Sequence, residues 1–323
     1  MRLESVAVLG GTGFLGTRLV ARLIKEGHTV TVLSRDREQH KHLLVLPGLT
    51  LENCDVYDEA QLSERLRGKD VVINLVGILN ERGFGGAGFR RAHTELTQGV
   101  LQAARSANVT RLLQMSALKA APDAPSYYLR TKGDAEKMIR ERSGALDWTI
   151  FQPSVIFGPG DSFLNRFAGL LAAIPLAFPL ARPGARFAPV LVDDVVEALL
   201  RCLHGGATSR RTYQLCGPQV YTLREIVALV ATLTGHRRWI VGLPDFAARL
   251  QALLMDFIPG RPFSSDNYRS LTVDSVCTED GFAQLGIQPQ SMLASARQYL
   301  GAFEDNARLS HNRAAASRDP SIR

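Results

Sequence analysis

The stretch "VAVLGGTGFLG", Val6–Gly16, joins a predicted strand to a predicted helix. Gly11, Gly13 and Gly16 within it have the spacing of a dinucleotide-binding loop. Gly10 and Gly11 allow a tight turn, and Gly13 lets backbone N–H groups approach a pyrophosphate. Gly16 lets the helix pack closely against the strand. A chance glycine turn is the alternative, but the order of strand, loop and helix favours the dinucleotide site.

Strand-like and helix-like segments alternate through the first half of the chain. The strand-like segments are rich in Val, Ile and Leu and read "SVAVLG", "HTVTVLS", "LTLENC", "DVVINLV", "RLLQMSA" and "DWTIFQP". Helices are predicted over 14–26, 90–107 and 128–142. This alternation is typical of parallel βαβ units with helices on both faces of a sheet. We therefore predict an α/β fold, a doubly wound parallel sheet of the Rossmann type, over residues 1–155.

The pattern changes after residue 155. We predict a smaller substrate or partner lobe, partly interleaved with the first domain, over residues 156–304, and a disordered tail rich in Ala, Ser, Arg and Asn over residues 305–323. Asp193 is expected to cap a helix, and "TLRE" from Thr222 to Glu225 has the spacing of a capping box.

Two apolar segments of the predicted lobe bear on membranes. The segment 167–181 is too short to cross a bilayer and is interrupted by two prolines. A second segment has an amphipathic stripe, which is expected to lie in the core rather than on a membrane. Both segments nevertheless favour an apolar partner over a sugar nucleotide. The residues of the stripe are Phe246, Leu250, Leu253, Leu254 and Phe257.

The composition limits the classes of function. The chain has 323 residues, of which 46% are hydrophobic, and a net charge of +7. The basic excess is diffuse, without a run of five Lys or Arg residues, so we expect no nucleic-acid partner. Cys54, Cys202, Cys216 and Cys277 form no Cys-x-x-Cys pair, which predicts no metal site and a reducing cytoplasm. The first strand begins too near Met1 to leave room for a targeting peptide.

The ends of the second, third and fourth strands supply further candidates for cofactor binding. Ser34 occupies the position of the carboxylate that binds the ribose in NAD-selective sites, and Arg35 follows it. Because a guanidinium grips a 2'-phosphate, NADP(H) is favoured over NAD(H) as the cofactor; a solvated charge at Arg35 is the alternative. Asp55 is placed either to accept from the adenine or to cap the next turn. Gly77 lies at the carboxyl end of the fourth strand, the edge where open sheets bind ligands.

Tyr128 and Lys132 form the candidate catalytic pair, together with Ser116. Residues four apart share a helix face, so the phenol and the ammonium point at one place. The pair opens the helix that follows the fifth strand, and Ser116 ends that strand in "QMSAL". Another loop, "NERGFGGAGF", follows the fourth strand and is either a cover for a ligand or a mobile surface loop.

With these residues in place, the chain resembles the short-chain dehydrogenase/reductases from about Met1 to about Gly301. The resemblance implies that Tyr128 is the proton donor and acceptor, and that Ser116 orients the substrate. It implies that Lys132 binds the nicotinamide ribose and lowers the pKa of the phenol toward neutrality. The full set of expected cofactor contacts is Gly10, Gly11, Thr12, Gly13, Phe14, Leu15, Gly16, Ser34, Arg35, Asp55, Val56, Val76, Gly77, Lys132, Pro153 and Val155.

Within this superfamily the chain is similar to the atypical branch that contains the NADPH-holding accessory subunit of respiratory complex I and its bacterial relatives. The matching phrases are "LGGTGFLG", "MSALKA", "PSYYLRTKGDAEK", "FQPSVIFGPGDSFLNRF" and "LVDDVVEAL". The related group includes proteins tied to ubiquinone biosynthesis. Two departures stand out: Leu9 replaces the Thr of the extended sugar-nucleotide branch, and the Asn of the proton relay in many reductases is missing. His93 either replaces that Asn or is a packed histidine.

Three hypotheses about function follow. The first is an NADP(H)-dependent oxidoreductase acting on a small hydrophobic substrate, quinone-like or isoprenoid. The second is a non-catalytic NADPH-binding accessory or assembly factor of a membrane-associated respiratory or ubiquinone-biosynthesis complex. The third and least favoured is a sugar-nucleotide epimerase or dehydratase. A cytoplasmic location is expected, with a peripheral position at the inner face of the membrane as the alternative.

Overall fold

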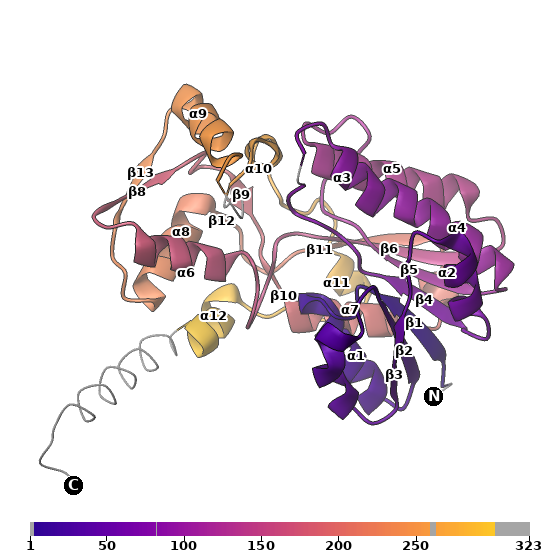
Figure 1. Cartoon of the computed structure of the whole chain (residues 1–323). Coiled ribbons are helices and arrows are strands. Elements are labelled where there is room, and N and C mark those ends of the chain that lie inside the picture. Colours follow the sequence, from indigo (N-terminus) through magenta and orange to yellow (C-terminus); the bar gives the residue numbers. More distant parts are fainter. Residues whose placement is uncertain (1–2, 82, 259–262, 301–323) are drawn as a thin grey trace, which may run out of the picture.

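A parallel sheet of seven strands organises the larger part of the molecule (Figure 1). The computed structural model describes residues 3–81, 83–258 and 263–300. The strand order is β11-β6-β5-β4-β1-β2-β3, and every neighbouring pair is parallel. The strands are β1 (Ser5–Leu9), β2 (Thr29–Ser34), β3 (Leu49–Asn53), β4 (Val71–Asn74), β5 (Arg111–Met115), β6 (Asp147–Pro153) and β11 (Arg211–Leu215). The predicted doubly wound α/β fold is confirmed.

Helices cover both faces of the sheet, as the apolar strands require. Val6 and Val8 of β1 face a core formed with α1 (Phe14–Lys25) and α7 (Val192–Arg201). Ala7 and Leu9, on the alternate side, face a core formed with α2 (Glu59–Leu66), α4 (Leu96–Ser106) and α5 (Tyr127–Arg142). The order of strands reverses between β1 and β4, so the ligand crevice is expected at the carboxyl ends of these two strands.

The helix predicted over 90–107 is interrupted. It begins as α3 (Ala87–Phe89), widens into a π-helix, η2 (Arg90–Glu95), and continues as α4. Single π-helical turns inside α-helices are common at functional sites. The π-helical turn places His93 next to α5, as described below.

The second half of the chain contributes to both parts of the molecule. β11 joins the edge of the large sheet beside β6, and α7 packs against α1. α11 (Gly281–Gln284) also packs against β11. The predicted boundary at residue 155 is therefore not a boundary of the sheet.

The smaller lobe has its own core and several two-stranded sheets. Its core joins α6 (Leu164–Ala173), α8 (Leu223–Leu233) and α12 (Met292–Leu300) with β8 (Ala177–Leu180) and β9 (Arg186–Phe187). β13 (Trp239–Gly242) pairs with β8, β12 (Tyr221–Thr222) pairs with β9, and β7 (Ile156–Phe157) pairs with β10 (Val190–Leu191). Two helices lie outside this core, α9 (Asp245–Met255) and α10 (Ser265–Ser270). Two 3-10 segments belong to the connections of the large sheet: η1 (Glu38–Val45) precedes β3, and η3 (Gly206–Thr208) precedes β11.

The two predicted helix caps have different outcomes. The capping box of Thr222 and Glu225 is confirmed, because each side chain bonds the backbone N–H of the other residue. The prediction for Asp193 was wrong. Leu191 is the N-cap of α7, and Asp193 lies within the first turn, where its carboxylate forms an ion pair with Arg18 at 3.2 Å. A carboxylate in the first turn still complements the helix dipole.

The expectation that the stripe on α9 lies in the core was also wrong. The exposed fractions of its side chains are 76% for Phe246, 54% for Leu250, 50% for Leu253, 60% for Leu254 and 72% for Phe257. The helix is instead held by small residues, since Ala248 and Ala252 are buried on its opposite side. The periodicity of the sequence predicts such a stripe correctly but does not say what covers it.

The remaining predictions about segments concern the membrane and the tail. Within the described residues, no helix combines the length and the apolar character needed to cross a bilayer. The segment 167–181 forms part of α6 and β8 in the core of the smaller lobe. The predicted disordered tail, 305–323, lies outside the described residues.

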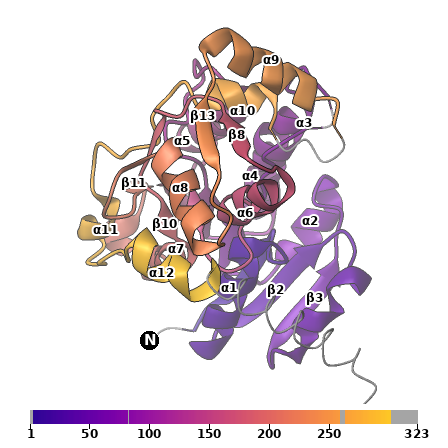
Figure 2. The ribbon, with the colours of Figure 1, turned by 90° about the vertical axis from the view of Figure 1, so that its left-hand side faces the viewer.

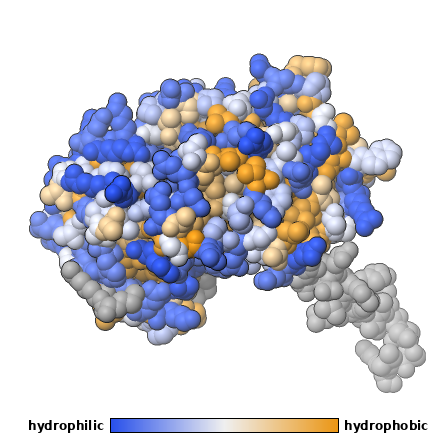
Figure 3. Space-filling view, turned by 180° about the vertical axis from the view of Figure 1, so that it is seen from behind, coloured by the Kyte–Doolittle hydropathy of each residue, from blue (hydrophilic) through white to orange (hydrophobic). Residues whose placement is uncertain are grey.

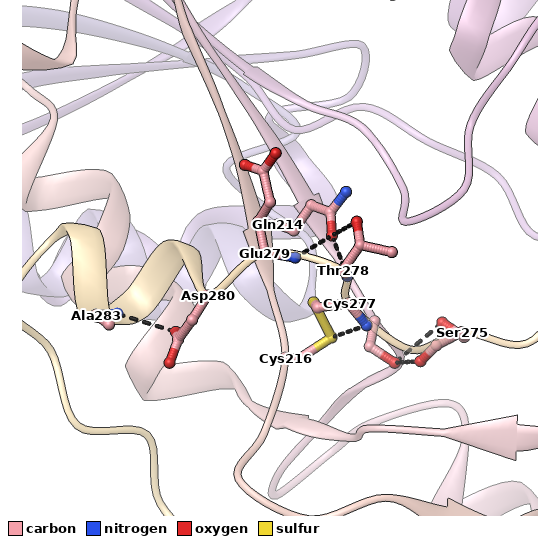
Figure 4. Close-up of a disulfide and its surroundings, with 9 residues drawn as sticks. Gln214, Cys216, Ser275, Cys277, Thr278, Glu279, Asp280 and Ala283 are labelled. Carbon is pink, nitrogen blue, oxygen red and sulfur yellow. Dashed lines mark hydrogen bonds between the residues drawn. A yellow bond between two sulfur atoms is a disulfide. The ribbon is translucent and has the colours of Figure 1, made fainter.

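Cys216 and Cys277 form a disulfide, which the expectation of a reducing cytoplasm did not foresee (Figure 4). Cys216 follows β11 directly, and Cys277 precedes α11, 61 residues later in the sequence. The side chain of Gln214 supports the same junction, because its Oε1 accepts from the backbone N–H groups of Thr278 and Glu279. The bond thus ties the edge strand of the sheet to the segment that enters α11. Cys54 and Cys202 are buried free thiols.

We expect reduction of this disulfide to destabilise the protein. Closing a loop of this length removes entropy from the unfolded chain and stabilises the fold by about 2–4 kcal/mol. Urea unfolding with and without dithiothreitol measures the change in the free energy of unfolding. A Cys277→Ser variant serves as the control, since its stability should not respond to dithiothreitol. Equal stabilities of the oxidised and reduced wild-type protein would contradict this prediction.

Candidate functional site

The glycine loop brings the start of α1 against the end of β1. Gly10 has a φ of +77°, a left-handed conformation that favours glycine. A Cβ on Gly16 would lie 2.2 Å from the carbonyl oxygen of Gly10, so the close packing of helix and strand depends on glycine at this position. Gly13 is the N-cap and offers no side chain to the first backbone N–H groups of α1. Those groups lack intrahelical partners, and the positive end of the helix dipole adds to their attraction for an anion.

Gly11 is closely packed, whereas Gly13 has open space beside the start of the helix. A Cβ on Gly11 would lie 2.8 Å from the Val32 side chain, whereas one on Gly13 would meet nothing closer than 3.4 Å. A cavity of about 430 Å³ opens here, lined by Thr12, Gly13 and Phe14 together with residues of α1 and the turn at Pro159 and Gly160. Leu15, in the first turn of α1, is buried in the core against the sheet. The loop therefore has the uncapped amides and the open space that a diphosphate requires.

Arg35 follows β2, and both Arg35 and Arg91 act electrostatically on Tyr57. Ser34 ends the strand and is buried, and its hydroxyl bonds the backbone of Asp36. Arg35 is exposed beyond it. Burial raises the pKa of Tyr57, while the positive charges of Arg91 and Arg35 act in the opposite direction. Arg91, which the sequence analysis missed, places its guanidinium 4.6 Å from the centre of the Tyr57 ring. A second cation thus stands on the same side as Arg35.

Asp55 takes the role of a turn cap. Its Oδ1 accepts from the backbone N–H of Tyr57 at 3.0 Å, which confirms the alternative that Asp55 caps the turn after β3. The contact of Asp55 with an adenine stays a prediction. The neighbouring Val56 is buried in the core between the sheet and α2.

The remaining expected cofactor residues follow the strands β4 and β6. Val76 and Gly77 come after β4, and a Cβ on Gly77 would lie 3.3 Å from Nζ of Lys132. Pro153 ends β6, and its carbonyl accepts from the N–H of Leu118. The carbonyl of Val155 accepts from the N–H of Val190. These positions lie at the carboxyl edge of the sheet, where the strand order predicts the crevice.

Lys132 is buried at this edge between two strands. Its Nζ donates to the carbonyl of Met115 at 3.0 Å and to that of Val76 at 3.4 Å. Burial lowers the pKa of Lys132 to about 8, and the negative charge of Glu136 partly offsets this shift. The ammonium is held at the point where the nicotinamide ribose is expected.

Tyr128 does not have the lowered pKa that the resemblance implies. Burial raises the pKa of Tyr128 to about 12, because a phenolate is poorly solvated there. Its ring packs edge-on against His93 and Phe89, with centroid distances of 5.5 and 6.1 Å. The ammonium of Lys132 is bonded to carbonyl oxygens instead of acting as the main neighbour of the phenol. The role of Tyr128 as proton donor and acceptor stays a prediction.

The hydroxyl of Ser116 is engaged with a buried carboxylate that the sequence analysis missed. Ser116 Oγ donates to Oε1 of Glu136 at 2.5 Å, and Gln152 Nε2 donates to the same carboxylate. Arg140 forms an ion pair with Glu136 at 2.7 Å. Glu136 lies one helical turn after Lys132, which is the signal in the sequence that identifies it. The role of Ser116 in orienting a substrate stays a prediction, and it would require this hydroxyl to leave Glu136.

His93 forms a closed set of hydrogen bonds. Its Nε2 accepts from the N–H of Ile78 at 3.2 Å, which leaves the proton on Nδ1. Nδ1 lies 2.9 Å from Thr131 Oγ1, and that hydroxyl donates to the carbonyl of Tyr127. Burial and the charge of Lys132 lower the pKa of His93 to about 2. The ring is thus a neutral link between the Gly77 segment and α5, so the packed histidine is the alternative that the contacts favour.

Two further carboxylates shape the entrance to α5. Glu81 accepts from the N–H groups of Gly86 and Gly88 at 2.6 and 2.8 Å and so fixes the glycine-rich loop after β4. Asp266 of α10 accepts from the N–H groups of Tyr127 and Tyr128 at 2.7 and 3.1 Å. The smaller lobe therefore caps the helix that carries the candidate pair.

Among the described residues, no three His, Cys, Asp or Glu side chains gather to hold a metal ion.

The buried His93 predicts a pH dependence of stability. Its pKa is about 2 in the folded protein and about 6.5 when unfolded, so the unfolded chain binds the extra proton between these values. The contribution of His93 is complete above about pH 6.5 and decreases as the pH falls, by up to about 1.4 kcal/mol per unit. Urea unfolding from about pH 7.5 to about pH 5 should give a shallower slope for His93→Gln than for the wild type. His236→Gln, outside the site, is the control; parallel curves for wild type and His93→Gln would contradict the account.

Comparison with solved structures supports the fold. A dTDP-glucose 4,6-dehydratase from Streptomyces venezuelae, solved as a double mutant with NAD and DAU bound, superposes with a TM-score of 0.73. The two chains are 20% identical, and the match covers 95% of this chain and 98% of the dehydratase. At this identity the likeness concerns the fold alone.

Comparisons of sequence identify the family. The NAD(P)H-binding family model matches residues 10–160. The mitochondrial NADH dehydrogenase [ubiquinone] 1 alpha subcomplex subunit 9 of Mus musculus is 31% identical over 293 residues, 87% of this chain and 76% of that protein. A ceramide reductase of Caulobacter vibrioides is 27% identical over 78% of this chain and 77% of its own length. The chain therefore belongs to the NAD(P)-binding short-chain dehydrogenase/reductase superfamily, in the branch that contains this subunit 9.

Proposed function

We propose that this protein holds NADP(H) as a structural or sensing ligand and acts as an accessory factor of a membrane-associated enzyme complex. The observation that carries the proposal is a contrast within one site. The glycine loop offers uncapped amides and space for a diphosphate. Ser116, which was expected to orient a substrate, is bonded to Glu136, and His93, at the position of the relay Asn, is bonded to Ile78 and Thr131.

The residues present fit the phosphorylated dinucleotide. The pyrophosphate would lie against the amides at Gly13 to Gly16, and Arg35 would bind the phosphate on the adenosine ribose. Arg91, whose guanidinium lies over the Tyr57 ring, adds a second positive charge to this region. Lys132 would donate to the hydroxyls of the nicotinamide ribose from its position between Val76 and Met115. The accessory role itself is drawn from the relatives named as subunit 9 of the NADH dehydrogenase 1 alpha subcomplex.

A second candidate is an NADP(H)-dependent oxidoreductase acting on a hydrophobic substrate. Two observations favour it: Tyr128 and Lys132 share a face of α5, and a relative is named as a ceramide reductase. The cofactor would supply or accept a hydride. Tyr128 would deliver the proton, and for this its pKa would have to fall from about 12 once the ammonium of Lys132 turned toward the bound ribose.

Substitutions at Gly13 and Tyr128 distinguish these functions. Gly13→Glu should lower the affinity for NADPH at least about 100-fold, because a carboxylate at the N-cap repels a diphosphate and occupies its place. The fold should persist, since a Cβ there meets nothing closer than 3.4 Å. Tyr128→Phe should leave the affinity within about threefold. Calorimetric titration with NADPH measures both.

The same variants are then tested for growth in a strain lacking the chromosomal gene. The accessory function predicts that Tyr128→Phe restores growth and Gly13→Glu does not. Loss of growth with both variants would favour the oxidoreductase. Growth with both variants would contradict both functions. Gly99→Glu is the matched control, because a Cβ on this helical glycine of α4 lies in open space.

Preference for the phosphorylated cofactor has its own test. Arg35→Asp should weaken NADPH binding about 10- to 100-fold and change NADH binding little, because only NADPH carries the phosphate that the guanidinium binds. Arg37→Asp, an exposed arginine two residues later, is the control for net charge. An equal loss of affinity for both nucleotides would show that Arg35 does not select the cofactor.

A further inference from the structure

The exposed face of α9 has no cover among the described residues and is unusually apolar for a protein surface. Half of the sixteen large apolar side chains that are exposed in the described residues belong to a stretch of about twenty residues around α9. They are Trp239, Val241, Phe246, Leu250, Leu253, Leu254, Phe257 and Ile258. Apolar side chains reach the surface in the corner where α9 and β13 lie, in the upper right of the view from behind (Figure 3). Such concentrations mark binding surfaces.

The helix presents these side chains along one stripe. Leu250 follows Phe246 by four residues, and Leu253 and Leu254 follow Leu250 by three and four, which places these side chains on one side of α9. Phe257 lies two residues past the end of the helix. Ala248 and Ala252, on the other side, pack with Tyr268 and Ala181. α9 lies over α10 at one end of the molecule, away from β2 and β3 (Figure 2). The apolar side therefore faces outward and not toward the large sheet.

The charges around α9 are basic. Between His236 and Ile258 the chain carries Arg237, Arg238 and Arg249, with Asp245 and Asp256 as the acidic residues. Asp256 is buried and its carboxylate accepts a hydrogen bond from the Ser265 hydroxyl, so it adds little negative charge to the surface. Asp245 forms ion pairs with Arg182 and Arg249, each 2.9 Å away, so the positive charges around α9 remain in excess. An apolar helix face with Phe and Leu, an exposed Trp nearby and basic flanks is the pattern of helices that lie in the interface of an anionic bilayer.

We propose that the α9 face docks on the surface of a lipid bilayer that contains anionic lipids. The apolar stripe inserts among the acyl chains, and the flanking arginines contact the headgroups. The proposal does not depend on cofactor binding. It goes beyond the proposed accessory function by naming the surface that meets the membrane.

The docked face also continues toward the candidate site. The rings of Phe257 and Phe84 lie 5.6 Å apart, and Phe84 and Leu253 line a cavity of about 230 Å³. Phe89, another lining residue, packs edge-on against Tyr128. A bilayer at α9 is therefore next to a cavity that is lined by both apolar and charged side chains and that reaches Phe89, a neighbour of Tyr128.

Vesicle binding by the purified full-length chain tests the proposal. Sedimentation with vesicles of phosphatidylcholine and phosphatidylglycerol should carry the protein down, and pure phosphatidylcholine vesicles should bind it more weakly. The double variant Leu254→Glu/Phe257→Glu should partition at least about tenfold less, because two inserting side chains become charged. Both positions are exposed, so folding is preserved; Val45→Glu, an 80% exposed position on η1, is the matched control.

The outcomes distinguish a lipid bilayer from a second copy of the chain as the partner of the α9 face. Failure of the wild-type protein to bind either kind of vesicle, or equal binding by the double variant, would overturn the proposal. A wild-type dimer in light scattering that the double variant abolishes, without vesicle binding, would assign the face to a second copy of the chain and also overturn it. NADPH affinity is measured on the same variants and should not change, so failure here is distinct from failure of the proposed function.

Discussion

The close contact of α1 with β1 is the constraint on which the nucleotide site depends. Gly16 allows the helix to begin within van der Waals distance of Gly10, and the positive φ of Gly10 turns the chain into that position. The first amides of α1 consequently open at the carboxyl edge of the sheet, beside the point where the strand order reverses. A side chain at Gly16 would separate helix from strand, whereas one at Gly13 would leave the fold intact and obstruct the ligand. Fold and binding thus impose different requirements on neighbouring glycines.

The second half of the site is organised around buried charge. Lys132 is taken out of water and is stabilised by two backbone carbonyls and by Glu136 one turn later. Glu136 is in turn satisfied by Ser116, Gln152 and Arg140, so the carboxylate joins β5, β6 and α5. Removing one partner would leave an uncompensated buried charge, which is costly. This network ties α5 to the sheet whether or not Tyr128 and Lys132 perform catalysis.

Features that depend on neighbouring residues were predicted from the sequence. Features that depend on contacts between distant residues were not. The apolar strands, the glycine loop and the capping box of Thr222 follow from neighbouring residues, and each was predicted from the sequence. β11 was missed because an edge strand 58 residues after β6 gives no local signal of its partner. The pairing of Cys216 with Cys277 and the bond of Ser116 to Glu136 likewise join positions that only the fold brings together. The stripe on α9 was recognised, but periodicity cannot distinguish a buried face from one left for a partner.

In the proposed complex, backbone amides at the start of α1 bind the diphosphate of NADP(H). Hydrogen–deuterium exchange of the purified protein, with and without saturating NADPH, tests it most directly. The account predicts slower exchange at the amides of residues 11–16, and at the segment around Arg35, when NADPH is present. Unchanged exchange at residues 11–16 under conditions where NADPH is bound would place the dinucleotide elsewhere and contradict the account.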